Sequence, residues 1–182
     1  IRFAARWQDP PRYVGLSDHN PGTELLLASY IQRVRELRDE LRESDGIDLL
    51  VGMELEWTPE GSALSGTGLA DLDYILAGYH GMGFSSAEQA EDYFKTVANF
   101  QYTDVVAHPD RFLGRVDPLM IDWAGVFNNF ASQKVVCEYN LTTPLRAEIF
   151  SIAVNQTDVK FVIGSDTHDF RSIGVRRIVE AW

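Results

Sequence analysis

Six short apolar runs recur along the chain, each separated from the next by a segment of helical or loop character. They lack the strict alternation of a strand with one wet face, so they predict strands buried on both faces of a parallel sheet. The runs are Y-V-G-L-S-D-H (13–19), D-L-L-V-G-M-E (48–54), Y-I-L-A-G-Y-H (74–80), D-V-V-A-H-P (104–109), K-V-V-C-E-Y-N (134–140) and K-F-V-I-G-S-D-T-H (160–168).

Two of the intervening segments have the spacing of amphipathic helices. From Glu24 to Glu43, apolar residues fall on one helical face while Arg and Glu fill the other. After Phe84, the letters S-S-A-E predict a capped helix start. The apolar positions are Leu27, Tyr30, Ile31, Val34 and Leu41 in the first segment and Ala90, Tyr93, Phe94 and Val97 in the second. Alternating strands and helices imply right-handed βαβ units, and therefore a barrel or an open, doubly wound sheet.

Length and composition restrict the class of protein. The 182 residues, 45% of them apolar, fit one compact domain. Neither a long apolar span nor a signal peptide is visible, so we expect a soluble, cytoplasmic protein that does not bind membranes. The formal charge of −11 disfavours long nucleic acid as a substrate and favours a small phosphoester. Cys137 is the single cysteine, and we interpret it as a buried structural thiol.

The four histidines of the chain all sit at the carboxyl ends of apolar runs. They are His19, His80, His108 and His168. Consecutive parallel strands deliver their carboxyl ends to one rim, so these imidazoles should converge. Imidazoles that converge with carboxylates build metal sites.

Carboxylates accompany the histidines on the same predicted rim. Asp18 and Asp166 each stand next to or near a histidine in the sequence, and Glu54 ends the second run with Glu56 two residues on. Strand alternation puts Glu54 and Glu56 on the same face. One of the two could then be a metal ligand and the other its support; we expect Glu54 to be the ligand and favour a solvated strand end for Glu56 over the supporting role. We expect Asp18 to orient a ring or an amide from behind the ligands.

In this order, the motifs S-D-H-N, G-M-E, Y-H-G, A-H-P-D-R, E-Y-N and G-S-D-T-H resemble those of the polymerase and histidinol phosphatase (PHP) family of metal-dependent phosphoesterases. The resemblance covers nearly the whole chain. It is greatest to the PHP domains of bacterial X-family DNA polymerases and to histidinol-phosphatase-like proteins. It implies a distorted (β/α)7 TIM-like barrel with up to three divalent metals, Zn, Mn or Fe, at its carboxyl rim.

The resemblance also assigns metal ligands by position. Glu54 would bridge two metals. The remaining ligands would be His80 and His108 on the third metal, Asp166 on the first, and His19 and His168 on the second. Catalysis would then rest on Glu54, Asp166 and His168.

Three further residues are candidates for substrate binding. Asn140 falls where family members place a polar residue near the site. Arg111 and Arg115 are candidates for phosphate contact, because a planar guanidinium binds phosphate oxygens with two donors; for either one, a surface ion pair is the alternative.

One family motif has no counterpart in this chain. The H-x-H of the first family strand is absent, and six runs fall one short of seven strands. We therefore expect a first strand upstream of Ile1.

The expected reaction is hydrolysis of a phosphate mono- or diester by a metal-activated water. One alternative is a nuclease domain, similar to a 3'-5' exonuclease, that acts on DNA ends within a larger polypeptide. A second alternative is a PHP module without catalysis that stabilises a partner.

Overall fold

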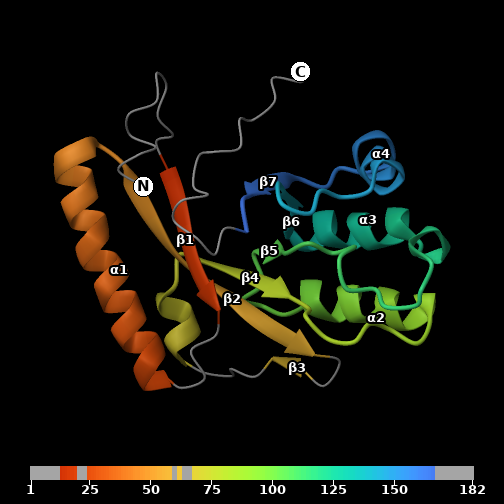
Figure 1. The fold of residues 1–182 in the computed structure, drawn as a ribbon, viewed down its shortest axis with the longest axis horizontal. Helices are drawn as coiled ribbons and strands as arrows, with labels where there is room; N and C mark the ends of the chain where they lie inside the picture. The colour runs from red at the N-terminus through yellow and green to blue at the C-terminus, as the bar shows by residue number, and fades with distance from the viewer. Residues whose placement is uncertain (1–12, 20–23, 59–60, 63–66, 167–182) are drawn as a thin grey trace.

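The computed structural model describes residues 13–19, 24–58, 61–62 and 67–166, and its centre is a curled parallel sheet (Figure 1). Six strands lie side by side in the order β1-β2-β4-β5-β6-β7, and β3 (Gly61–Ser62) pairs antiparallel with β2. The parallel strands are β1 (Tyr13–His19), β2 (Asp48–Thr58), β4 (Tyr74–Gly78), β5 (Val105–Val106), β6 (Val136–Asn140) and β7 (Phe161–Gly164). Each predicted run supplies one of them, so the six parallel strands are confirmed.

Four α-helices and two 3-10 turns connect the strands of the described residues. They are α1 (Glu24–Asp45), η2 (Thr67–Asp71), α2 (Ala87–Ala98), η3 (Pro118–Met120), α3 (Trp123–Gln133) and α4 (Ala147–Gln156). Both predicted helices are confirmed, and α2 begins at the predicted cap, where the Ser86 hydroxyl accepts the Gln89 N–H at 3.2 Å. No helix in these ranges is long and apolar enough to cross a membrane.

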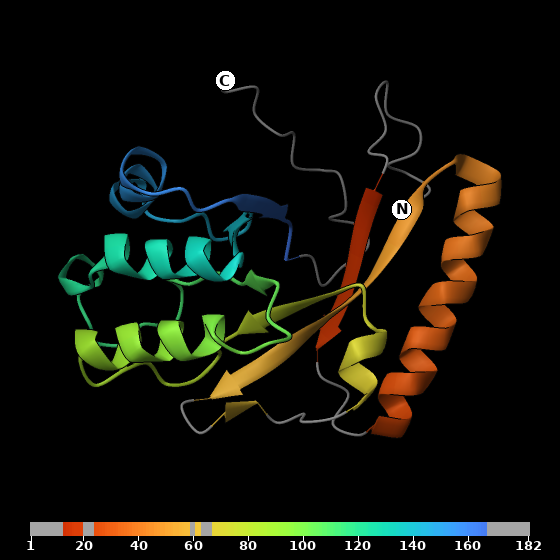
Figure 2. The same cartoon turned by 180° about the vertical axis from the view of Figure 1, so that it is seen from behind.

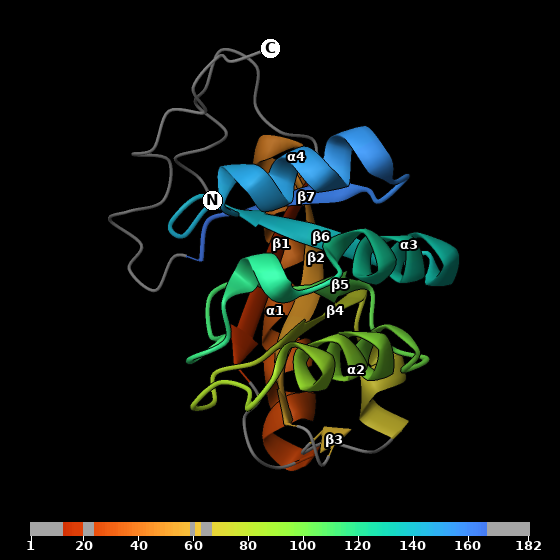
Figure 3. The same cartoon turned by 90° about the vertical axis from the view of Figure 1, so that its right-hand side faces the viewer.

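The helices pack against one face of the sheet. Register places Leu55, Ala77, Val106 and Cys137 side by side on neighbouring strands, and all four side chains are buried. The curl of the sheet separates the helices that cover this face, so that α1 lies at one end and α2, α3 and α4 at the other (Figure 2). The last three stack against one another in chain order (Figure 3). The buried thiol of Cys137 belongs to this core, as expected.

The core has two parts along this face. One lies between α1 and the first strands, and it contains Leu27, Ile31, Val34 and Leu41 of the helix with Leu49, Val51, Met53 and Leu55 of β2. The other is rich in aromatic rings from α2 and α3, among them Phe94, Trp123, Phe127 and Phe130. Together they bury the apolar stripes that the helix periodicity predicts.

The opposite face of the sheet carries a small apolar cluster and the polar residues of the site. Tyr74 lies across it, and a Cβ at Gly15 would stand 2.6 Å from the Tyr74 Oη and one at Gly52 would overlap the ring. Burial raises the pKa of Tyr74 to about 12. Glu54 and Glu138 point from this face, so it is the face on which a site can form.

The expected (β/α)7 barrel is wrong. Among the described residues, β1 pairs only with β2 and β7 pairs only with β6, so the sheet forms an open half-barrel with two unjoined edges. The connection from β2 to β4 also carries β3 and η2 where a barrel unit would carry an α-helix. The residue pattern allowed either a barrel or a doubly wound sheet. The sheet is instead unclosed, and its parallel strands follow one another in a single direction across it.

Candidate metal centre

Four neighbouring strands bring their carboxyl ends to one rim, as the sequence predicts. His19 is the last residue of β1 and is the register partner of Glu54 on β2. His80 and His108 each stand two residues beyond their strands, β4 and β5. Because these strands are parallel and adjacent, three imidazoles meet around one carboxylate.

Glu54 is the centre of this cluster. Its Oε1 lies 3.1 Å from His108 Nε2 and 3.3 Å from His80 Nε2, and its Oε2 lies 4.0 Å from His19 Nδ1. His19, Glu54 and His80 could hold a metal ion, because one ligand atom from each lies within 4.8 Å of the others. Imidazole nitrogen and carboxylate oxygen are donors that Zn²⁺ and similar ions prefer.

The charges in this cluster are coupled. Burial alone would raise the pKa of Glu54, but the hydrogen bond with His108 and the nearby imidazoles lower it below the ordinary 4.5. Burial alone would lower the pKa of His108, but Glu54, Glu138 and Asp166 raise it above 6.5. Glu54 is therefore ionised at neutral pH.

The backbone at His108 is held in a strained conformation. Its φ is +29°, in the left-handed region that residues other than glycine rarely adopt. This conformation costs roughly 1–3 kcal/mol. The carboxylate of Glu138 accepts the His108 N–H at 3.0 Å, and the His108 carbonyl accepts the Arg111 N–H at 3.0 Å. Asn140 also donates to Glu138, at 3.2 Å. These buried contacts fix the direction in which the imidazole leaves the chain.

Glu56 contacts His80 through both carboxylate oxygens. Its Oε1 accepts the His80 N–H at 3.0 Å, and its Oε2 lies 2.6 Å from Nδ1 of the ring. Glu56 therefore does not simply face solvent, although its side chain is 37% exposed; its contacts are those of the supporting residue that strand alternation also allowed. The signal was present in the Glu-x-Glu alternation, which puts Glu54 and Glu56 on one face of β2.

Asp166 and Arg111 form an ion pair beside the cluster. Arg111 Nη1 donates to Asp166 Oδ2 at 2.6 Å, and the Arg111 guanidinium also lies over the Phe112 ring, 5.0 Å from its centroid. Phe112 contacts the rings of His80 and His108 edge-on, with centroids 5.2 and 5.6 Å apart. The charge of Asp166 acts on His108, but within the described residues Asp166 is not part of the group that could hold a metal.

The other expected site residues lie in different surroundings. Asn140 is 1% exposed, and its side-chain oxygen accepts the N–H groups of Thr142 and Thr143, so it lies behind the site and not on the surface that a substrate would touch. Asp18 accepts the backbone N–H of His19 at 2.8 Å, and Arg115 is exposed. His168 lies outside the described residues.

Glu138 and Phe112 are the residues that sequence reasoning missed. Glu138 alternates with Asn140 in E-Y-N, which is the pattern of two polar side chains on one strand face. Phe112 gave no such signal, because a single aromatic residue in a loop is common.

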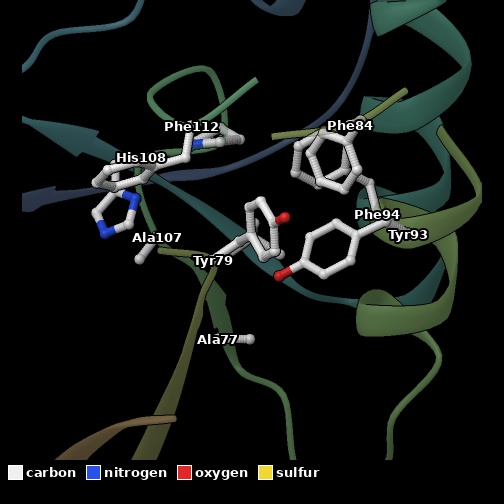
Figure 4. Close-up of a pocket in the computed structure, with 10 residues that line it drawn as sticks. Ala77, Tyr79, Phe84, Tyr93, Phe94, Ala107, His108 and Phe112 are labelled. Carbon is white, nitrogen blue, oxygen red and sulfur yellow. The ribbon is translucent and has the colours of Figure 1, made fainter. Parts of the chain in front are cut away.

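Aromatic rings line a small pocket beside His108 (Figure 4). A cavity of about 10 Å³ lies there, too small for more than a single water. His108 and Phe112 stand on one side of it, and Tyr79, Tyr93 and Phe84 stand on the side towards α2.

No family model matches the chain, and no curated protein matches its sequence.

Proposed function

We propose that this protein is a metal-dependent phosphoesterase that hydrolyses a small phosphate ester at the rim around Glu54. The observation that carries the proposal is the position of this one carboxylate, which faces three imidazoles at 3.1, 3.3 and 4.0 Å. A single carboxylate that faces several histidines on separate strands is an arrangement suited to a cation.

The donor set fits a divalent ion of the zinc, manganese or iron type. His19, Glu54 and His80 would hold the ion, with His108 beside them. Such an ion acts as a Lewis acid on a phosphoryl oxygen and lowers the pKa of water that it binds. The ordered motifs that resemble the PHP family support the same reaction class and would add Asp166 and His168 to the ligands.

The residues around the cluster have complementary roles in the proposal. Arg111 would bind phosphate oxygens with its planar guanidinium, since its side chain remains 33% exposed while it pairs with Asp166. Phe112 makes T-shaped contacts with two histidine rings and would limit access of water on that side. The net charge of −11 favours a small substrate over a polyanion.

The test is release of 4-nitrophenol from 4-nitrophenyl phosphate and from bis(4-nitrophenyl) phosphate with added Mn²⁺ or Zn²⁺. We expect turnover that EDTA removes and that Glu54→Gln reduces to background. Glu43→Gln, which changes an exposed glutamate on α1 by the same single charge, is the matched control and should keep the wild-type rate.

Absence of ion-dependent turnover on both esters would contradict the proposal. Wild-type turnover by Glu54→Gln would show that the activity arises elsewhere. Comparison of the monoester with the diester separates a phosphatase from a phosphodiesterase, and release of nucleotides from single-stranded DNA would favour the nuclease alternative.

A further inference from the structure

Glu56 lies immediately outside the group that could hold a metal, and both of its carboxylate oxygens are directed at His80. One accepts the backbone N–H at 3.0 Å, and the other lies 2.6 Å from ring Nδ1. The two contacts fix the main chain of His80 and its ring at the same time. A carboxylate that only faced solvent would make neither.

The strand register explains why Glu56 reaches this position. Glu56 is paired with Gly78 on the neighbouring strand β4, and His80 follows two residues later. A Cβ at Gly78 would stand 2.5 Å from Glu54 Oε1 and 3.1 Å from His80 Cε1. The missing side chain at Gly78 therefore leaves the space in which the imidazole lies between the two glutamates of β2.

The ring of His80 has little freedom to turn in this space. The centroid of the His19 ring lies 5.3 Å away, that of His108 4.9 Å and that of Phe112 5.2 Å. With Nδ1 on Glu56, the opposite nitrogen Nε2 points at Glu54 Oε1, 3.3 Å away. Glu56 thus decides which nitrogen of His80 faces the candidate metal centre.

We infer that Glu56 is a positioning residue, which keeps the proton of His80 on Nδ1 and leaves the lone pair of Nε2 for a cation; this inference rests on the proposed function. A carboxylate behind a ligating histidine fixes its tautomer and raises its basicity, and the loss of such a partner weakens metal binding about 10–100-fold. Glu56 would not bind the ion itself, because both of its oxygens are engaged by His80.

The experiment compares Glu56→Ala, Glu56→Gln and the wild-type protein by Zn²⁺ competition with a chromogenic chelator. We expect the Zn²⁺ Kd to rise about 10–100-fold in Glu56→Ala and less in Glu56→Gln, which keeps one acceptor for the ring. Glu43→Ala removes the same charge from an exposed position on α1 and should leave the Kd unchanged. Because the Glu56 side chain is 37% exposed, its removal should leave the protein folded, which circular dichroism checks.

A second readout does not depend on metal. In metal-free protein, the short contact to Glu56 predicts a low-field imidazole N–H proton in the NMR spectrum, assigned to His80 by its loss in His80→Asn. The signal should vanish in Glu56→Ala and persist in Glu43→Ala. Persistence of the signal in Glu56→Ala, or an unchanged Zn²⁺ Kd, would overturn the inference. If the wild-type protein binds no Zn²⁺ while the NMR signal behaves as expected, the proposed function fails and the positioning of the ring by Glu56 stands.

Discussion

His80 and His108 share two contacts, with Glu54 and with a second glutamate, but they differ in burial. Each follows a parallel strand by two residues, directs Nε2 at Glu54 Oε1, and donates its backbone N–H to a glutamate of a neighbouring strand at 3.0 Å. The side chain of His80 is 28% exposed, and that of its partner Glu56 is 37% exposed. The side chain of His108 is 2% exposed, and Glu138 is 4% exposed.

Because the two histidines differ in burial, loss of the hydrogen-bond partner should have different consequences for each. A buried acceptor cannot be replaced by water, so its loss leaves donors unsatisfied at about 1–3 kcal/mol each. At a wet position, water replaces the lost partner and the cost is small. We therefore expect loss of the buried partner of His108 to affect mainly the stability of the fold, and loss of the exposed partner of His80 to affect mainly the site.

The largest expected effect comes from removing the buried carboxylate. Glu138→Leu leaves the His108 N–H and the Asn140 amide without their acceptor, so we expect a loss of roughly 2–5 kcal/mol in the free energy of unfolding. Glu56→Leu should cost less than about 1 kcal/mol. Urea unfolding in EDTA measures both. Equal losses of unfolding free energy in the two variants would contradict the contrast between the buried and the exposed glutamate.

Substitution of two glycines separates an effect on stability from an effect on the site, and the expected effects are of intermediate size. A Cβ at Gly164 would overlap the Glu138 carboxylate, so Gly164→Ala should lower the free energy of unfolding by about 1–3 kcal/mol. Gly78→Ala crowds Glu54 and His80 instead, and should weaken Zn²⁺ binding about tenfold or more with a smaller change in stability. Unfolding and chelator competition on both variants check this, and a reversed pattern would contradict it.

The smallest expected effect is the pH dependence of the metal-free protein. The pKa of Glu54 is lowered in the fold. Its contribution to the free energy of unfolding is therefore present above pH 4.5 and is lost as the pH falls below that value. The pKa of His108 is raised, so its contribution is complete below pH 6.5 and is lost as the pH rises through the folded value. Burial raises the pKa of Glu138, so its contribution to the free energy of unfolding is complete below pH 4.5 and is lost as the pH rises through the folded value.

Urea unfolding from pH 4 to 9 in EDTA measures this profile. We expect the free energy of unfolding of the wild-type protein to decline above pH 6.5. In His108→Asn the decline should be smaller. Glu43→Gln should keep the wild-type slope. An identical decline in His108→Asn would assign the titration to other groups.

Local pattern predicted the six parallel strands and two of the four α-helices among the described residues, α1 and α2, because these elements follow from which residues must be buried. It did not locate α3 and α4. The histidines at the strand ends could be expected to converge, since parallel strands share one rim, and His19, His80 and His108 do so. The closure of the sheet could not be predicted, because it depends on pairing between the edges β1 and β7, which no local pattern encodes.

The partners of the site residues were harder to predict than the residues themselves. Arg111 and Asp166 are 55 positions apart, and His108 and Glu138 are 30 apart. Neither pair has a signature within a sequence window. Asn140 was expected at the substrate because it falls where members of the PHP family place a polar residue near the site, yet its side chain is used within the fold.

The central claim is that Glu54 and the surrounding imidazoles bind a divalent cation. Equilibrium dialysis of the wild-type protein and Glu54→Gln against Zn²⁺, followed by metal analysis, tests it most directly. The account predicts at least one Zn²⁺ retained per chain by the wild-type protein and a loss of that ion in Glu54→Gln, with both proteins folded. Equal retention by the two proteins, or none by the wild type, would contradict it.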